Sequence, residues 1–238
     1  MNRSLLGLAI VLFAAFALLP AIGEDTKGAE KGWVQLFNGK DLTGWKIHPK
    51  PGAPIEEVLT KQKDGKTIAF EAKLKDGKVV PLWRVEDGIL VGSGPASHLF
   101  SERGDYQNFE YRVEASINDG GNSGQYFRTE FGPRFPRGYE AQINATHHDT
   151  IRTGSLYLRD VKEVLVENVA PHKPDEWFKQ EVMADGDHIT ITVNGKKTVD
   201  YKDPKKAYTK GHFALQGHDP GTTVKFRRIE VRELPATK

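Results

Sequence analysis

Tight-turn dipeptides are the feature of this sequence that most constrains its fold. Asn-Gly and Asp-Gly pairs favour two-residue β-hairpin turns because both residues tolerate a positive φ angle. Seven such pairs are spread along the chain, at Asn38-Gly39, Asp64-Gly65, Asp76-Gly77, Asp87-Gly88, Asp119-Gly120, Asp185-Gly186 and Asn194-Gly195. No convincing helical pattern longer than two turns follows residue 23. The sequence therefore predicts an all-β protein.

The segments between these turns alternate apolar and polar residues, as half-buried strands do. In residues 109–117 the apolar side chains occupy every second position. In residues 224–231 the apolar positions change parity midway, which predicts a β-bulge near Arg227-Arg228. Many short strands in a stretch of about 200 residues indicate a two-sheet antiparallel sandwich of the jelly-roll type.

Charge and cysteine content exclude several classes of protein. The 238 residues include 34 Lys and Arg against 32 Asp and Glu, so the formal net charge is only +2. A balance of this kind provides no basic surface for nucleic acid, and we expect no nucleic-acid partner. The chain has no cysteine, which excludes disulfides and zinc sites built on thiolates.

The first 23 residues have the pattern of a secretory signal peptide. Arg3 precedes an apolar run from Leu5 to Leu19, and small residues follow in Ala21-Ile22-Gly23. The alternative is an N-terminal membrane anchor, but the run is shorter than the ~20 residues of a spanning helix. We therefore expect a secreted or periplasmic protein with no membrane partner after cleavage.

The remainder of the chain has the organisation of one domain. We expect a flexible segment over residues 24–32 and a single β-sandwich over residues 33–234. Residues 46–81, rich in Lys, Pro and Asp-Gly, are expected to form an irregular insertion or an exposed hairpin. The oligomeric state is left open by the sequence.

Three strand-like segments place polar groups in rows on the face opposite their apolar residues. These rows are Glu140, Gln142 and Asn144 in residues 138–144, His212, Gln216 and His218 in residues 211–218, and Tyr126 and Arg128 in residues 122–128. Amide, carboxylate and guanidinium groups beside aromatic rings are suited to binding sugar hydroxyls and sugar faces. The alternative for each residue alone is a solvated strand position, with Glu140 and Arg128 in an ordinary cross-strand ion pair.

Other motifs limit the chemistry that the chain could perform. His147-His148-Asp149 could hold a metal or form an exposed loop, and no established zinc-ligand spacing accompanies it. The sequence also lacks a G-x-S-x-G elbow, a phosphate-binding loop and the E-x-D-x-E carboxylate spacing of jelly-roll endoglucanases. Acid/base or metal-assisted chemistry remains if the protein is an enzyme.

A set of ordered motifs extends over most of the chain. They are Leu36-Phe37-Asn38-Gly39-Lys40-Asp41-Leu42-Thr43-Gly44-Trp45, Trp83-Arg84-Val85-Glu86-Asp87-Gly88-Ile89-Leu90, Asn108-Phe109-Glu110, Gly121-Asn122-Ser123-Gly124 with Phe127-Arg128, Gly138-Tyr139-Glu140-Ala141-Gln142-Ile143, Thr153-Gly154-Ser155-Leu156-Tyr157 and Leu215-Gln216-Gly217-His218. The set resembles the 3-keto-disaccharide hydrolase domain family. This resemblance implies a concanavalin-like jelly-roll sandwich that cleaves 3-keto-glycosides by elimination, in some members with hydration of the 3-keto-2-hydroxy-glucal and with a divalent metal ion.

The resemblance also implies a set of site residues. Carried over to this sequence, the catalytic candidates are Glu140, His218 and Arg128, and the substrate-binding candidates are Asn122, Ser123, Gln142, Tyr157 and Gln216. We expect Glu140 or His218 to be the base. Arg128, Gln142 or a divalent cation would stabilise the oxyanion, and Tyr157 could donate a proton to the leaving oxygen.

Two alternatives to an enzyme remain open. A non-catalytic, lectin-like carbohydrate-binding module would use the same polar face, since a fold does not decide function. A structural protein without a ligand would leave Glu140, Gln142 and His218 freely replaceable.

Overall fold

The computed structural model describes residues 30–132, 137–158, 163–165, 167 and 169–235. Over these ranges the chain forms strands, turns and loops, and no helix is present, so none is long and apolar enough to cross a membrane. The predicted signal peptide at residues 1–23 and most of the expected flexible segment 24–32 lie outside the described residues.

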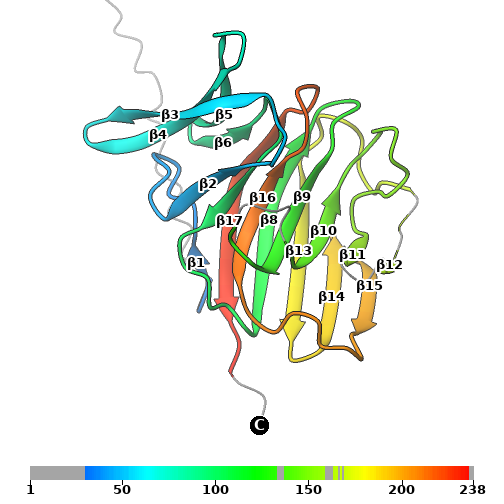
Figure 1. The fold of residues 1–238 in the computed structure, drawn as a ribbon. Helices are drawn as coiled ribbons and strands as arrows, with labels where there is room; N and C mark the ends of the chain where they lie inside the picture. Colours follow the sequence, from blue (N-terminus) through cyan, green and yellow to red (C-terminus); the bar gives the residue numbers. More distant parts are fainter. Residues whose placement is uncertain (1–29, 133–136, 159–162, 166, 168, 236–238) are drawn as a thin grey trace, which may run out of the picture.

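Two antiparallel sheets make up the sandwich (Figure 1). The strands of the first sheet are β1 (Val34–Gln35), β3 (Ile55–Lys63), β4 (Lys66–Leu74), β5 (Val79–Glu86), β6 (Ile89–Gly92), β8 (Phe109–Ile117), β13 (Phe178–Asp185), β14 (His188–Val193), β15 (Lys196–Lys202) and β17 (Val224–Glu233). Their order is β15-β14-β13-β8-β17-β6-β5-β4-β3, and β1 also pairs with β17.

The second sheet carries the candidate site described below. Its strands are β2 (Trp45–Pro49), β7 (Ser97–Ser101), β9 (Ser123–Thr129), β10 (Tyr139–Ile143), β11 (Leu156–Leu158), β12 (Glu163–Leu165) and β16 (His212–Gly217). They follow the order β12-β11-β10-β9-β16-β7-β2. The predicted all-β, two-sheet antiparallel class is confirmed.

Residues 46–81 form regular strands in the structure. They contain most of β2, all of β3 and β4, and the start of β5. The β3–β4 hairpin extends sideways from the sandwich (Figure 1) and turns at Asp64-Gly65, where both residues have positive φ angles of 51° and 73°. This turn therefore matches the Asp-Gly preference for two-residue hairpins.

The parity change in residues 224–231 corresponds to a β-bulge, as predicted. Strand β17 pairs with β8, and the pairing register shifts between Phe226 and Arg228. The bulge lets Phe226 and Ile229 both be fully buried although they are three positions apart and would face opposite sides of a regular strand.

Aromatic rings fill the space between the two sheets. The ring of Phe213 in β16 stacks on that of Tyr111 in β8, with centroids 4.0 Å apart. It also contacts Tyr106 at 4.2 Å and Phe109 at 4.8 Å between centroids. These rings join the sheet that carries the polar rows to the opposite sheet, so they fix the base on which the site is built.

We expect Phe213→Ala to lower the free energy of unfolding by about 3–5 kcal/mol, because it leaves a cavity among buried rings. Urea denaturation followed by circular dichroism measures this change. Val34→Ala is the control, since Val34 is 59% exposed and its truncation should change stability by less than about 0.5 kcal/mol. A Phe213→Ala protein as stable as the control would contradict this account of the core.

Candidate functional site

The polar rows meet on the outer face of the second sheet, the face turned away from the aromatic core. Strand β10 pairs with β9 and β11, which places Glu140 opposite both Tyr126 and Tyr157. The same register places Gln142 opposite Gly124. Side chains at directly opposite positions lie close together, so these strands present one continuous polar surface.

Gly124 provides the space in which the Glu140 side chain lies. A Cβ atom on Gly124 would be 2.1 Å from Glu140 Oε1 and 2.8 Å from its Cδ. Any other residue at position 124 would therefore displace the carboxylate. The glycine allows the Glu140 carboxylate to lie directly over the strand backbone.

Tyrosine and amide groups hold this carboxylate in place. The hydroxyl of Tyr126 donates to Glu140 Oε2 at 2.6 Å, and Gln216 Nε2 donates to the Tyr126 hydroxyl at 3.1 Å. The amide of Gln142 satisfies its neighbours when its nitrogen faces Glu140 Oε1 at 3.0 Å and the Ser123 carbonyl oxygen at 3.1 Å, and we assign that orientation. The result is a pre-oriented network around Glu140.

One acceptor in this network, the side-chain oxygen of Gln216, has no described hydrogen-bond partner. Gln216 is 3% exposed, and its Oε1 has no hydrogen-bond partner among the described residues. A buried amide oxygen without a donor is unfavourable by about 1–3 kcal/mol.

A cavity of about 160 Å³ lies over this network. It is lined by Asn122, Glu140, Gln142, Asp149, Ile151, Tyr157, Gln216 and His218. All of these side chains except that of Ile151 carry polar groups. The cavity is therefore suited to a small, hydroxyl-rich ligand rather than to an apolar one.

His218 lies at the end of β16 and is oriented by its neighbour in the chain. Its Nδ1 is 2.6 Å from Asp219 Oδ2, so the Nδ1–H donates and the lone pair of Nε2 remains available. Burial acts to raise the pKa of Asp219, but the hydrogen bonds from His218 and from the Gly221 amide outweigh it and hold that pKa below its usual value. Asp219 is therefore an anionic partner that fixes the His218 tautomer.

His147 lies beside this pair with the opposite tautomer. Its Nδ1 accepts a hydrogen bond from the Asp149 backbone amide at 3.1 Å, so in the neutral ring the proton is on Nε2. That nitrogen lies 3.8 Å from Asp219 Oδ2. Burial, with smaller contributions from His148 and His218, lowers the pKa of His147 and favours the neutral ring.

His147, His218 and Asp219 are close enough to suggest a metal site, with one ligand atom from each within 4.8 Å of the others. A cation needs lone pairs: His218 Nε2 has one, and each Asp219 oxygen keeps one besides the hydrogen bond that it accepts, whereas His147 Nε2 carries a proton in this arrangement. A divalent ion at this place stays a prediction, and the mechanism below is derived from the side chains alone.

Six of the eight predicted site residues line the cavity: Asn122, Glu140, Gln142, Tyr157, Gln216 and His218. Arg128 and Ser123 do not. The Ser123 hydroxyl donates to the Gln216 carbonyl oxygen at 2.7 Å and joins β9 to β16. Ser123 supports the strands below the cavity instead of lining it.

The expectation that Arg128 shares a face with Glu140 is wrong. The backbone of Arg128 has a φ of 48°, and the register between β9 and β16 shifts at this point, which turns the side chain away. Its guanidinium donates to the carbonyl oxygens of Gln107 at 2.6 Å and Gly186 at 2.8 Å, and it lies 5.9 Å from the ring centre of Phe109. Burial lowers the pKa of Arg128.

Two other members of the polar rows have structural contacts. Asn144 Nδ2 donates to the carbonyl oxygens of Asp149 and Ile151, and its Oδ1 accepts from the His147 amide, so it shapes the loop that carries His147. His212 Nδ1 bonds to the Ser101 carbonyl oxygen at 2.8 Å, away from the cavity.

Sequence analysis missed three residues of the site. Tyr126 was expected on the polar face but without a role, Asp219 was not considered, and Asp149 was considered only as a metal ligand. A carboxylate directly after His218 was a usable indication, since an adjacent Asp often orients an imidazole. The contribution of Asp149 through its backbone amide has no equivalent indication in the sequence.

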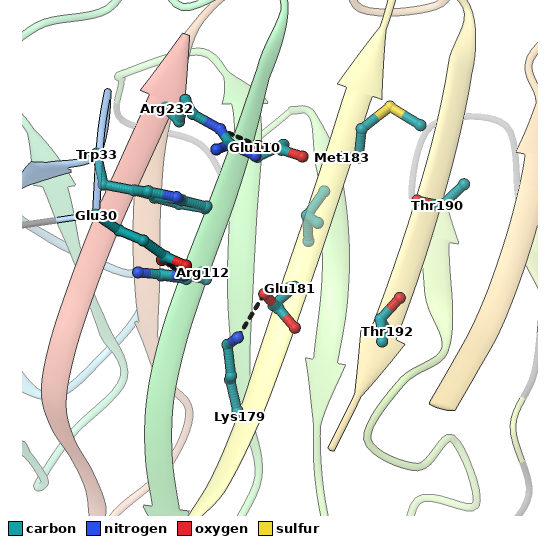
Figure 2. A pocket seen from close by; sticks show the side chains of 11 residues that line it. Glu30, Trp33, Glu110, Arg112, Lys179, Glu181, Met183, Thr190, Thr192 and Arg232 are labelled. Atoms are coloured by element: carbon teal, nitrogen blue, oxygen red, sulfur yellow. Dashed lines mark hydrogen bonds and ion pairs between the residues drawn. The ribbon is translucent and has the colours of Figure 1, made fainter. Parts of the chain in front are cut away.

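The outer face of the first sheet has a second hollow, of about 340 Å³ (Figure 2). Its charged groups neutralise one another. Arg112 pairs with Glu30 at 2.6 Å and stacks on Trp33 at 3.8 Å from the ring centre, and Lys179 pairs with Glu181 at 2.7 Å. Because these charges are already compensated, we place the candidate site on the second sheet.

The fold and the site together define an all-β sandwich with a polar cavity on one outer sheet face. Its sequence also matches the profile of the 3-keto-alpha-glucoside-1,2-lyase-like domain over residues 32–232. The chain belongs to this family, and the predicted resemblance is confirmed. No curated protein matches the chain.

Solved structures share the fold at low sequence identity. A candidate glycosyl hydrolase from Parabacteroides distasonis has 21% identity and a TM-score of 0.56, covering 86% of this chain and 94% of its own. The carbohydrate-binding module CBM66 from Bacillus subtilis has 18% identity and a TM-score of 0.50, covering 79% and 95%. A Bacillus subtilis protein with a galectin-like fold has 12% identity and a TM-score of 0.56, covering 88% and 98%.

We expect His147 to titrate below pH 6.5, since burial and the neighbouring imidazoles oppose its protonation. The folded state then binds fewer protons than the unfolded state, so this residue's contribution to stability is complete above pH 6.5 and is lost as the pH falls. Histidine ring resonances followed by NMR from pH 4 to 9 measure the pKa. A His147 pKa at or above 6.5 would contradict the arrangement.

Proposed function

We propose that this chain is an exported enzyme that cleaves 3-keto-glycosides by elimination. The observation that carries the proposal is the pairing of His218 with Asp219 at the edge of a cavity that also contains the Glu140 carboxylate. In the described part of the chain, no hydrogen bond to His218 Nε2 is present, so this nitrogen can accept a proton. Membership of the 3-keto-alpha-glucoside-1,2-lyase-like family supports the same chemistry.

The substrate supplies the acidity that the reaction needs. A ketone at C3 acidifies the hydrogen on C2, and we assign His218 Nε2 as the base that takes this proton. The electron pair of the C2–H bond forms an enediolate with its charge on the C3 oxygen. When the C3 carbonyl re-forms, a C1–C2 double bond forms and the C1–O bond breaks. The leaving oxygen takes a proton, which gives an alcohol and a 3-keto-2-hydroxy-glucal.

The other residues of the cavity receive roles from their positions. Asp219 is a positioning residue for His218. The Tyr157 hydroxyl has no described hydrogen-bond partner, and we assign it to bind a hydroxyl of the sugar on the side of the ring away from His218. The proton that His218 Nε2 has taken from C2 then passes to the leaving oxygen, in place of the donation from Tyr157 that the sequence suggests. Strands β11 and β16 are separated by β10 and β9, about 14 Å in strand spacings, so a sugar ring fits between Tyr157 and His218.

Amide and carboxylate groups would hold the remaining polar atoms of the sugar. Glu140, Gln142 and Gln216 are placed to bind ring hydroxyls. Since Arg128 points away from the cavity, we assign the amide of Asn122 as the donor to the enediolate oxygen. Water added to the glucal in the same cavity would give the 3-keto sugar.

Export is part of the proposal and rests on the sequence of residues 1–23. A cleaved signal peptide would deliver the protein to the periplasm or outside the cell. The substrate is then an extracytoplasmic 3-keto-glycoside, including 3-keto-disaccharides.

We expect His218→Ala and Glu140→Gln each to lower turnover of 3-keto-glucosides by at least about 100-fold, since each removes an acid/base or binding group from the cavity. Product formation followed by NMR, with and without chelator, measures the rate. His188→Ala and Glu181→Gln are matched controls on the opposite sheet, where both side chains are partly exposed. Wild-type rates in both site variants would refute the mechanism.

Gly124→Ala tests the placement of Glu140 without changing an ionisable group. The added methyl group would occupy the position of the carboxylate, so we expect a loss of turnover of about 100-fold in a folded protein. Circular dichroism checks the fold. Gly132→Ala is the control that should keep its rate, since nothing lies within 4 Å of a Cβ there and Gly132 is not among the described glycines with a positive φ angle.

A non-catalytic carbohydrate-binding module is the second candidate. The pre-oriented amide and carboxylate network around Glu140 would serve binding alone, and the fold is shared with a carbohydrate-binding module. Calorimetry with unmodified glycans separates the two. Tight binding of these glycans, with no product from any 3-keto-glycoside, would replace the enzyme proposal with this one.

A further inference from the structure

A second pocket lies on the other side of His218 and shares this residue with the candidate site. It has a volume of about 280 Å³ and is formed by residues 50–54, Pro95-Ala96 and residues 218–220. The first of these segments connects β2 with β3, and the second connects β6 with β7. We call it the proline-lined pocket. A ligand in the candidate site could extend past His218 into it.

Backbone hydrogen bonds join the walls of the proline-lined pocket. The Lys50 amide donates to the Ala96 carbonyl oxygen at 2.9 Å, which ties the two loops together. The Ala53 amide donates to the Lys50 carbonyl oxygen at 3.0 Å. Just beside them, Pro49 of β2 pairs with Ser97 of β7. The pocket is therefore held by backbone contacts in the absence of a ligand.

The chemistry of this pocket differs from that of the neighbouring polar cavity. Four of its ten lining residues are Pro51, Pro54, Pro95 and Pro220, which have no backbone N–H to donate. The other lining residues are Gly52, Ala53, Ala96, Lys50, His218 and Asp219. Only the last three have polar side-chain atoms.

His218 and Asp219 are already engaged, and the third polar residue, Lys50, is exposed to solvent. Asp219 accepts from His218 Nδ1 and from the Gly221 amide, and His218 Nε2 is assigned to the reaction. A group rich in hydroxyls would lose its hydrogen bonds to water here without replacing them, whereas an apolar group would bury apolar surface.

We infer that the proline-lined pocket holds the leaving group of the substrate and selects 3-keto-glycosides whose leaving alcohol is apolar over those whose leaving group is a sugar. This inference rests on the proposed function, because His218 acts on C2, next to the carbon that bears the leaving group. The sugar that reacts lies in the polar cavity, and its aglycone extends past His218 between the proline loops.

Three 3-keto-α-glucosides test the inference, with methanol, cyclohexylmethanol and glucose as leaving groups. The methyl group is too small to fill the pocket and reports the chemistry alone. For the wild-type protein we expect kcat/KM for the cyclohexylmethyl substrate to exceed that for the glucosyl substrate by at least about tenfold. Turnover of both at equal efficiency, or a preference for the glucosyl substrate, would overturn the inference and leave the proposed function standing.

Ala53→Asp places a carboxylate at the partly exposed rim of the pocket. We expect it to reduce kcat/KM for the cyclohexylmethyl substrate by at least about tenfold and to leave the methyl substrate unchanged. Val79→Asp is the control, since Val79 is 50% exposed and does not line the pocket. An equal effect of Ala53→Asp on both substrates would overturn the inference. If the wild-type protein turns over none of the three, the proposed function fails and the inference fails with it.

Discussion

The pairing register of β9, β10 and β16 is the constraint on which the site depends. Side chains in a strand alternate between faces, so a slip by one residue would turn Glu140 and Gln142 into the core and expose Tyr139 and Ala141. The aromatic layer around Phe213 opposes such a slip, because it buries the alternate positions of the same strands. Hydrophobic packing on one face of the sheet thus sets the geometry of polar groups on the other.

His218, which we assign as the base, is not positioned by the strand register. His218 follows the last residue of β16, and its orientation comes from Asp219 and from the loop that carries His147. The floor of the cavity is therefore built from strands and its edge from loops. In the enzyme that we propose, the strands would keep the sugar site constant while the loops, including those of the proline-lined pocket, would vary to accept different leaving groups.

Much of the fold could be predicted from the sequence, because turn-forming dipeptides and the alternation of apolar and polar residues along a strand are local properties of the chain. The bulge in β17 was predictable for the same reason, since apolar residues on either side of it show the parity change. The bulge at Arg128 was not, since β9 ends one residue later, at Thr129, and the bulge depends on pairing with the distant β16. The structure shows why position 211 is glycine, because a Cβ there would lie 2.4 Å from the Arg128 backbone, but the sequence alone does not reveal this contact. Tautomers and loop contacts, such as those of His147, require coordinates.

Arg128 itself has a consequence for the protein as a whole. Its guanidinium donates hydrogen bonds to the carbonyl oxygens of Gln107, Gly186 and Tyr208, which belong to three different loops at one end of the sandwich. Proteins often join loops in this way with a calcium ion surrounded by oxygen ligands. Here the cation is covalently attached and carries its charge at any physiological pH. The three loops are therefore held by hydrogen bonds from a cation that cannot be lost to solvent, chelated or exchanged for another ion.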